Sequence, residues 1–271
     1  MLRDQSLYSC ESLALTDSRP PVDEVRGRYR LRYARTAMEV EACCRLRYEV
    51  FNVELGEGLA ESAATGLDHD EFDAQCVHLM VVDETVQRVI GTYRLQTREM
   101  AEEGRGFYSA GEFDLSAVTG ALFENTVELG RAAIAAEHRD KLVLFLLWRG
   151  LMAFLLWNRK RHLFGCSSLT SQDPETGLQA SDWLARNGFR HEEFETPPKP
   201  GYECVVPGHE IFEGEFKPPK LFATYLRHGA RLSSPPALDR VFGTIDFLTW
   251  LDSKQLDPRK AKLFSLGLPK R

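Results

Sequence analysis

The chain has 271 residues, of which 43% are hydrophobic, and 34 Lys and Arg against 40 Asp and Glu give it a net charge of −6. This composition is typical of a globular protein, and the length suffices for one large domain or two small ones. The acidic balance argues against a nucleic-acid-binding protein, which needs a basic surface to neutralise phosphates. The six cysteines form no C-x-x-C pair and the N-terminus lacks an apolar secretory segment, so we expect buried thiols in a reducing cytoplasm.

The first half of the chain predicts a short series of strands around one helix. Residues 1–26 have no hydrophobic period and include two adjacent prolines, so we expect a flexible leader there. Further on, the patterns predict a strand within 27–36, a helix over 38–51 capped by Thr36, a long loop with at most a short helical turn over 55–76, and an antiparallel hairpin formed by 77–83 and 89–96.

The second half alternates strands with helices. Its predicted elements are a strand at 126–134, a helix at 141–157, a strand at 162–169, a helix at 174–187, strands near Phe189 and at 202–206, a helix at 218–229, and a strand or helix at 244–251. The apolar helix at 141–157 is shorter than the ~20 residues that span a bilayer, so we expect a core helix. The order predicts an α/β (α+β) fold with a mixed sheet in one domain over 27–253, followed by a basic tail at 254–271.

Several common catalytic motifs are absent from the sequence. It contains no G-x-G-x-x-G, G-x-x-x-x-G-K-[ST], H-E-x-x-H or G-x-S-x-G segment, and its seven histidines have no ligand spacing with cysteine. We therefore expect chemistry without a bound cofactor, a metal or a nucleophilic side chain.

Charged residues stand where the predicted elements are otherwise apolar: Arg47, Asp68, Asp70, Asp73, Arg94, Glu128 and Arg131. Because buried charges must be paired, they can form one polar site. Each also has an ordinary interpretation as a solvated residue of an amphipathic helix, a loop or an edge strand. The spacing of Glu128 and Arg131 places them on opposite faces of a flat strand unless a bulge intervenes.

These residues occur in an order that resembles a known signature. The series Arg47-x-x-x-Phe51, Asp68-x-Asp70-x-x-Asp73, Gly91-Thr92-x-Arg94-Leu95, Phe113 and Glu128-x-x-Arg131 is similar to that of acyl-homoserine-lactone synthases, which are GNAT-superfamily acyltransferases. A closer resemblance, to the "hemolysin-like" ornithine N-alpha-acyltransferases of ornithine-lipid synthesis, rests on Glu128-Leu-Gly-Arg131, the segment 147–151, the segment 218–230, and Asp239 with Thr244-x-Asp246-Phe247. It covers roughly residues 33–252.

The resemblance implies a fold and a reaction. The fold is a GNAT-like, mixed, mostly antiparallel central sheet flanked by helices. The reaction is transfer of a 3-hydroxyacyl chain from acyl carrier protein to the α-amine of an amino acid, with ornithine ahead of lysine or glycine. Such an amine, with a pKa near ~8, needs a base. We expect Glu128 as that base with Arg131 beside it, and an acceptor site shaped by Arg47, Phe51, Asp68, Asp70, Asp73, Arg94 and Phe113.

The donor and partner predictions rest on basic residues and on a missing loop. The superfamily's glycine-containing pyrophosphate loop is degenerate at residues 137–142, which favours a phosphopantetheine thioester on acyl carrier protein. Candidate docking residues are Arg139, Lys141, Arg149 and Lys160, with ordinary helix-end solvation as the alternative. The basic tail suggests peripheral contact with an anionic membrane at the inner face of the cytoplasmic membrane. Alternative functions are a synthase of signalling N-acyl amino acids or acyl-homoserine lactones, and a non-catalytic acyl- or carrier-binding regulator.

Overall fold

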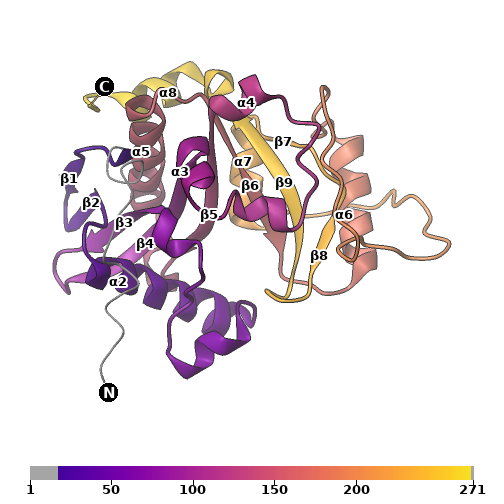
Figure 1. The fold of residues 1–271 in the computed structure, drawn as a ribbon, viewed down its shortest axis with the longest axis horizontal. Helices are drawn as coiled ribbons and strands as arrows, with labels where there is room; N and C mark the ends of the chain where they lie inside the picture. Colours follow the sequence, from indigo (N-terminus) through magenta and orange to yellow (C-terminus); the bar gives the residue numbers. More distant parts are fainter. Residues whose placement is uncertain (1–17, 270–271) are drawn as a thin grey trace. The chain divides into compact units, whose positions relative to one another are not determined.

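The computed structural model describes residues 18–269, so the first part of the expected leader, residues 1–17, lies outside the described residues (Figure 1). The chain divides into two compact units where we expected one domain. Unit 1 contains the residues up to Gly106, Val127–Lys160 and the residues from Lys262, and unit 2 contains Phe107–Thr126 and Arg161–Ala261. The division has a physical basis, because two clusters of buried apolar side chains consist only of unit 2 residues.

Unit 1 is built on an antiparallel sheet. Its strands are β1 (Asp23–Arg26), β2 (Tyr29–Tyr33), β3 (Val77–Asp83), β4 (Arg88–Thr97) and β5 (Thr126–Ile134), each paired with the next. The predicted hairpin and the predicted strand at 126–134 are confirmed.

The strand β1 lies in the segment that we expected to be a flexible leader. Three of its four residues are charged and most are exposed, so the segment shows no hydrophobic period. Ion pairs hold it instead: Asp23 pairs with Arg30 of the neighbouring strand at 2.8 Å, and Glu24 pairs with Arg149 at 2.7 Å. The leader prediction therefore fails for these residues.

Two predicted helices cover opposite faces of the sheet in unit 1. The helix α2 (Ala37–Tyr48) begins with a capping box of Thr36 and Glu39 and continues into a π-helical turn, Glu49–Leu55. It lies on the face that carries the side chain of Arg94. The helix α5 (Lys141–Trp157) packs on the other face, where Gly91 admits its side chains. No helix within residues 18–269 combines the length and the apolar character needed to cross a membrane.

The expected basic tail is partly folded. The helix α8 (Pro258–Ser265) buries Phe264, whose ring stacks on that of Trp148 at 5.6 Å between centroids. The guanidinium of Arg149 donates to the backbone carbonyls of Leu263, Phe264 and Leu266. Because Arg149 is itself buried, it fastens the end of the chain to α5.

The remaining elements are α3 (Arg98–Glu103) in unit 1 and, in unit 2, α4 (Gly120–Glu124), β6 (His162–Leu169), α6 (Pro174–Arg186), α7 (Lys220–Arg227), β7 (Arg231–Leu232), β8 (Ala237–Asp239) and β9 (Thr244–Asp252). The open choice at 244–251 is resolved as a strand, since β9 pairs antiparallel with β6. The strands predicted near Phe189 and at 202–206 do not form, and only isolated bridges occur there. Prolines at 197, 198 and 200 remove ladder N–H groups from this segment.

Candidate active site

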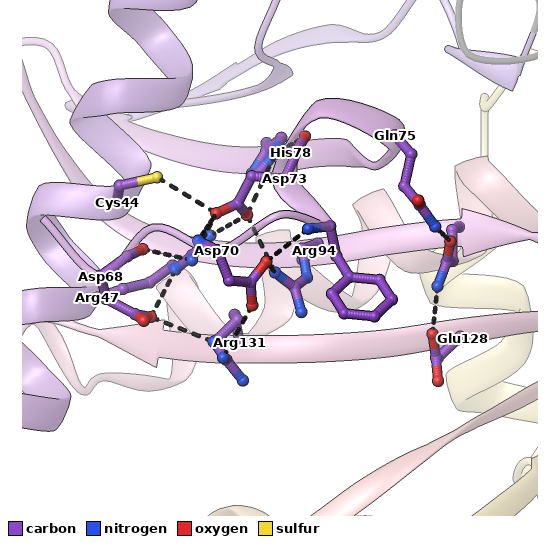
Figure 2. A network of polar contacts seen from close by, with 12 residues as sticks. Cys44, Arg47, Asp68, Asp70, Asp73, Gln75, His78, Arg94, Glu128 and Arg131 are labelled. Atoms are coloured by element: carbon purple, nitrogen blue, oxygen red, sulfur yellow. Dashed lines mark hydrogen bonds and ion pairs between the residues drawn. The ribbon is translucent and has the colours of Figure 1, made fainter. Parts of the chain in front are cut away.

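Six of the residues singled out in the sequence lie together in unit 1 and form an ionic cluster (Figure 2). The cluster consists of Arg47, Asp68, Asp70, Asp73, Arg94 and Arg131. Its members come from α2, from the loop between α2 and β3, and from the neighbouring strands β4 and β5. Arg131 is thereby joined by direct ion pairs to Asp68 and Asp70, more than 60 positions earlier in the sequence.

Arg47 is the buried centre of this cluster. Its guanidinium donates to Asp68 Oδ2 at 2.9 Å, to Asp73 Oδ1 and Oδ2 at 2.7 and 3.0 Å, and to the backbone carbonyl of Asp68. The side chain is 1% exposed. The expected contact of Arg47 with the acceptor stays a prediction, and in the structure its guanidinium is enclosed by these carboxylates and the carbonyl. Its role is to tie α2 to the acidic loop.

The outer part of the cluster contains Asp70, Arg94 and Arg131. Asp70 receives hydrogen bonds from Arg94 Nη1 at 2.5 Å and from Arg131 Nη2 at 2.9 Å. The Asp70 side chain is 11% exposed, more than any other carboxylate of the cluster. Asp70 is therefore the carboxylate of the cluster that is most open to solvent.

A β-bulge brings Arg131 to the cluster. The register of β4 and β5 shifts between Thr92 and Arg94, and Arg131 has a φ of 50°, in the left-handed region. The extra residue reverses the alternation of side chains along β5. Arg131 consequently reaches Asp68 and Asp70. Glu128 lies opposite Gln96 on the same face of the sheet as Arg131, although the two residues are three positions apart.

Three guanidinium groups balance three carboxylates in this buried place. Burial opposes ionisation of Asp73, but the charges of Arg47 and Arg94 outweigh it and hold the pKa of that carboxyl well below its usual range. His78, whose Nε2 lies 3.0 Å from the carbonyl of Asp73, has its pKa lowered to about 4 by burial, so it is neutral at pH 7. Burial raises the pKa of the Cys44 thiol beside Asp73. This cysteine is therefore no thiolate nucleophile.

Glu128 is 4% exposed and lies at one end of a chain of side-chain amides (Figure 2). The Gln96 amide donates to Glu128 Oε2, and Gln75 Nε2 donates to Gln96 Oε1 at 2.7 Å. We call Gln75 and Gln96 the amide chain. Neither residue was predicted from the sequence, although Gln96 stands two positions after Arg94 in an almost fully buried strand, where an amide has to find a partner.

The two predicted aromatic residues are both buried. Phe51 is buried in the π-helical turn that follows α2. Phe113 is fully buried in unit 2, in an apolar cluster with Phe164, Leu248 and Trp250. Phe113 is therefore a core residue of unit 2, and its predicted part in the acceptor site stays a prediction.

The four predicted docking residues divide into two groups. Arg149 is buried against α8, and Lys160 pairs with Glu99 at 2.5 Å with a side chain only 7% exposed, so neither offers its charge to a docking protein. Arg139 and Lys141 are exposed, although Arg139 also pairs with Glu54. Only the second group meets the requirement for surface contact.

Among residues 18–269, one group of side chains has donor atoms close enough to share a cation: Glu112, Cys166 and Asp246 of unit 2, within 4.8 Å of one another. The pKa of Asp246 is raised to about 6, first by burial and then by the charge of Asp239. A hydrogen bond between the Asp246 and Glu112 carboxyls, for which one proton is needed, accounts for the proximity of these acids.

Replacement of Asp246 by asparagine is expected to stabilise the protein at pH 8. The carboxyl has a raised pKa in the folded state, so its penalty is absent below pH 3.8 and complete above about pH 6. The asparagine amide can donate a hydrogen bond at any pH, without first binding a proton from solvent. The replacement should therefore raise the free energy of unfolding by about 3 kcal/mol at most. Urea unfolding at pH 8 and pH 4 measures the difference, and an equal effect at both values would contradict the assignment.

Comparison with known proteins places this site in a family. The model of the acetyltransferase (GNAT) domain matches residues 46–149, which hold all six residues of the ionic cluster. The L-ornithine N(alpha)-acyltransferase of Agrobacterium fabrum is 33% identical over 83% of this chain and 81% of its own length. The enzyme of the same name from Rhizobium meliloti is 33% identical over 88% of this chain and 86% of its own length. Among solved structures, the acyl-homoserine-lactone synthase LasI aligns with 90% of this chain and 98% of its own, at 12% identity and a TM-score of 0.48.

The fold and the match together define a GNAT-type acyltransferase, as the sequence predicted. The chain belongs to the family of L-ornithine N(alpha)-acyltransferases. It is therefore an enzyme of amino-acid N-acylation, and the predicted class of reaction is confirmed.

Proposed function

We propose that the protein transfers a 3-hydroxyacyl chain from acyl carrier protein to the α-amine of ornithine, with Glu128 as the general base. The acceptor is that named for the relatives from Agrobacterium fabrum and Rhizobium meliloti. The observation that carries the assignment of the base is the position of Glu128: a buried carboxylate on β5, oriented by Gln96 and three residues from the bulged Arg131.

The reaction needs one proton acceptor and no nucleophilic side chain. An α-ammonium group with a pKa near ~8 is mostly protonated at pH 7, and Glu128 accepts its proton. The free amine then attacks the thioester carbon, the C–N bond forms and the C–S bond breaks. As the adduct collapses, its nitrogen loses a second proton, which protonates the departing thiolate of phosphopantetheine. Glu128 releases the first proton to solvent, so protons and charges balance.

The outer part of the ionic cluster supports the choice of a zwitterionic acceptor. Arg131 offers a guanidinium that can hold a carboxylate, and Asp70 offers a carboxylate that can hold an ammonium group. Both side chains belong to a cluster that is rigid behind them, because Arg47 and Asp73 are locked together by two hydrogen bonds.

The start of α5 supports a donor without a nucleotide. A helix N-terminus binds pyrophosphate through free backbone N–H groups. Here the carboxylate of Asp140 accepts hydrogen bonds from the N–H groups of Leu142 and Val143, each at 2.8 Å. An anion at this terminus would compete with a negative side chain, which favours acyl carrier protein over coenzyme A.

Product analysis tests this proposal directly. Purified protein is incubated with 3-hydroxypalmitoyl carrier protein or the matching coenzyme A thioester, each with ornithine, lysine, glycine and homoserine. Mass spectrometry should find N-acylornithine from the carrier-bound donor as the main amide, and much less from the coenzyme A thioester. A dominant product with another acceptor would overturn the choice of ornithine, and the absence of any amide would overturn the whole proposal.

A further inference from the structure

The amide chain is anchored on a backbone turn between α3 and the start of unit 2. The N–H of Arg105 donates to Gln75 Oε1 at 2.8 Å, and Gln75 Nε2 donates to the carbonyl of Gly106 at 2.9 Å. Gln75 Nε2 also donates to Gln96 Oε1, and Gln96 donates to Glu128. One continuous series of hydrogen bonds therefore leads from the main chain to the proposed base.

The orientation of both amides follows from this anchor. A backbone N–H can only donate and a backbone carbonyl can only accept, so the oxygen of Gln75 faces Arg105 and its nitrogen faces Gly106. With its nitrogen thus directed, Gln75 donates to the oxygen of Gln96. The nitrogen of Gln96 must then point at Glu128 and at the carbonyl of Gly106, 3.4 Å away.

The turn is shaped to accept Gln75. A Cβ added to Gly104 would lie 2.3 Å from Gln75 Oε1 and 2.6 Å from its Cδ. Any side chain at this position would displace the amide from its place. Gln96 is fixed as well, since it is 2% exposed and stands directly opposite Glu128 in the register of β4 and β5.

We infer that Gln96, held by Gln75, is a positioning residue for Glu128, an inference that rests on the proposed function. Its N–H donor favours the ionised carboxylate, which is the form that accepts a proton. It also fixes the carboxylate orientation, and a base displaced by about 1 Å loses roughly 100-fold in rate. The amide chain thus fixes the orientation of the base and directs one N–H donor at its carboxylate.

Replacement of Gln96 by methionine tests this inference, because methionine keeps the length and volume but removes the amide. We expect kcat to fall about 10- to 100-fold with little change in the KM for ornithine. We also expect the acidic limb of the pH–rate profile to move to higher pH, since the ionised base loses a donor. Gln96→Glu should move the limb further, because a second carboxyl then faces the first.

Two further variants make the test decisive. Gln75→Met should move the acidic limb of the pH–rate profile in the same direction by a smaller amount. Because Gln75 is less buried than Gln96, this variant remains informative if Gln96→Met fails to fold. Gln179→Met is the control, because Gln179 also donates to a glutamate, Glu175 at 3.3 Å, but in unit 2. Its kcat and pH profile should remain those of the unaltered enzyme.

The outcomes separate the inference from the proposed function. If Glu128→Gln is inactive while Gln96→Met and Gln75→Met keep the original kcat and pH limb, the positioning role is overturned and the base stands. If Glu128→Gln keeps its activity, the proposed base itself is wrong. Loss of kcat in Gln96→Met with an unmoved pH limb would also overturn the inference, because a general structural disturbance explains that result.

Discussion

Replacement of Asp73 by alanine is expected to lower the free energy of unfolding by about 3–5 kcal/mol, the usual effect of breaking a buried ion pair. The carboxylate accepts hydrogen bonds from Arg47 and Arg94, and also from the backbone N–H of Asp70 at 2.9 Å. Its removal leaves two guanidinium groups in a buried place with one carboxylate fewer. The loop that carries Asp68 and Asp70 should lose its order as a result.

Urea unfolding followed by circular dichroism measures the effect of Asp73→Ala. Glu41→Ala is the control, since Glu41 pairs with Arg45 at 2.8 Å on the exposed surface of the same helix, α2. Exposed pairs of this type contribute at most about 0.5 kcal/mol. A loss below 1 kcal/mol in Asp73→Ala would show that the ionic cluster does not stabilise the fold.

The second large effect concerns catalysis. Glu128→Gln keeps the size of the side chain and should lower kcat by about 100- to 10,000-fold at pH 7, the range typical of a general base. Its carbonyl oxygen can still accept from Gln96, so the unfolding midpoint should stay close to that of the unaltered protein. The loss should shrink as the pH rises above about 8, because the acceptor amine then loses its proton without help.

Initial rates of amide formation between pH 6 and pH 9.5 measure this effect. Glu102→Gln serves as the control, because Glu102 forms an exposed ion pair with Arg98 in the same unit. A Glu128→Gln enzyme with a reduced rate that is the same fraction of the original at every pH would argue for a purely structural role of Glu128.

The secondary-structure elements that depend on residues close together in the sequence were predicted correctly. The hairpin of β3 and β4, the Thr36 cap of α2 and the apolar helix α5 follow from spacing and capping residues within a short window. The edge strand β1 has no such signal, because its side chains are mostly charged and exposed, and one of the ion pairs that hold it joins Glu24 to the distant Arg149. The division into two units depends on which apolar side chains meet, and spacing along the chain carries no information about that.

The candidate site was predicted in its membership more than in its roles. The rule that buried charges are paired indicated that Arg47, Arg94 and the aspartates meet. It could not indicate that Arg47 lies innermost and is enclosed by carboxylates. The condition on Glu128 and Arg131 was met by the bulge, whose presence depends on a single left-handed residue that the sequence does not mark. Gln75 and Gln96 were not predicted, because an uncharged amide in a sequence does not by itself indicate a buried polar site.

The anchoring of α8 changes how the basic end of the chain can be studied. Deletion from residue 256 onward would remove the Phe264 ring that stacks on Trp148 and the backbone carbonyls that accept hydrogen bonds from Arg149. If less of the truncated protein then sedimented with lipid vesicles, the cause could be a disrupted core as readily as the loss of electrostatic attraction to the membrane. Arg259 and Lys260 lie on the exposed part of this helix. Replacing both with uncharged residues tests membrane binding without removing the packing of α8 on α5.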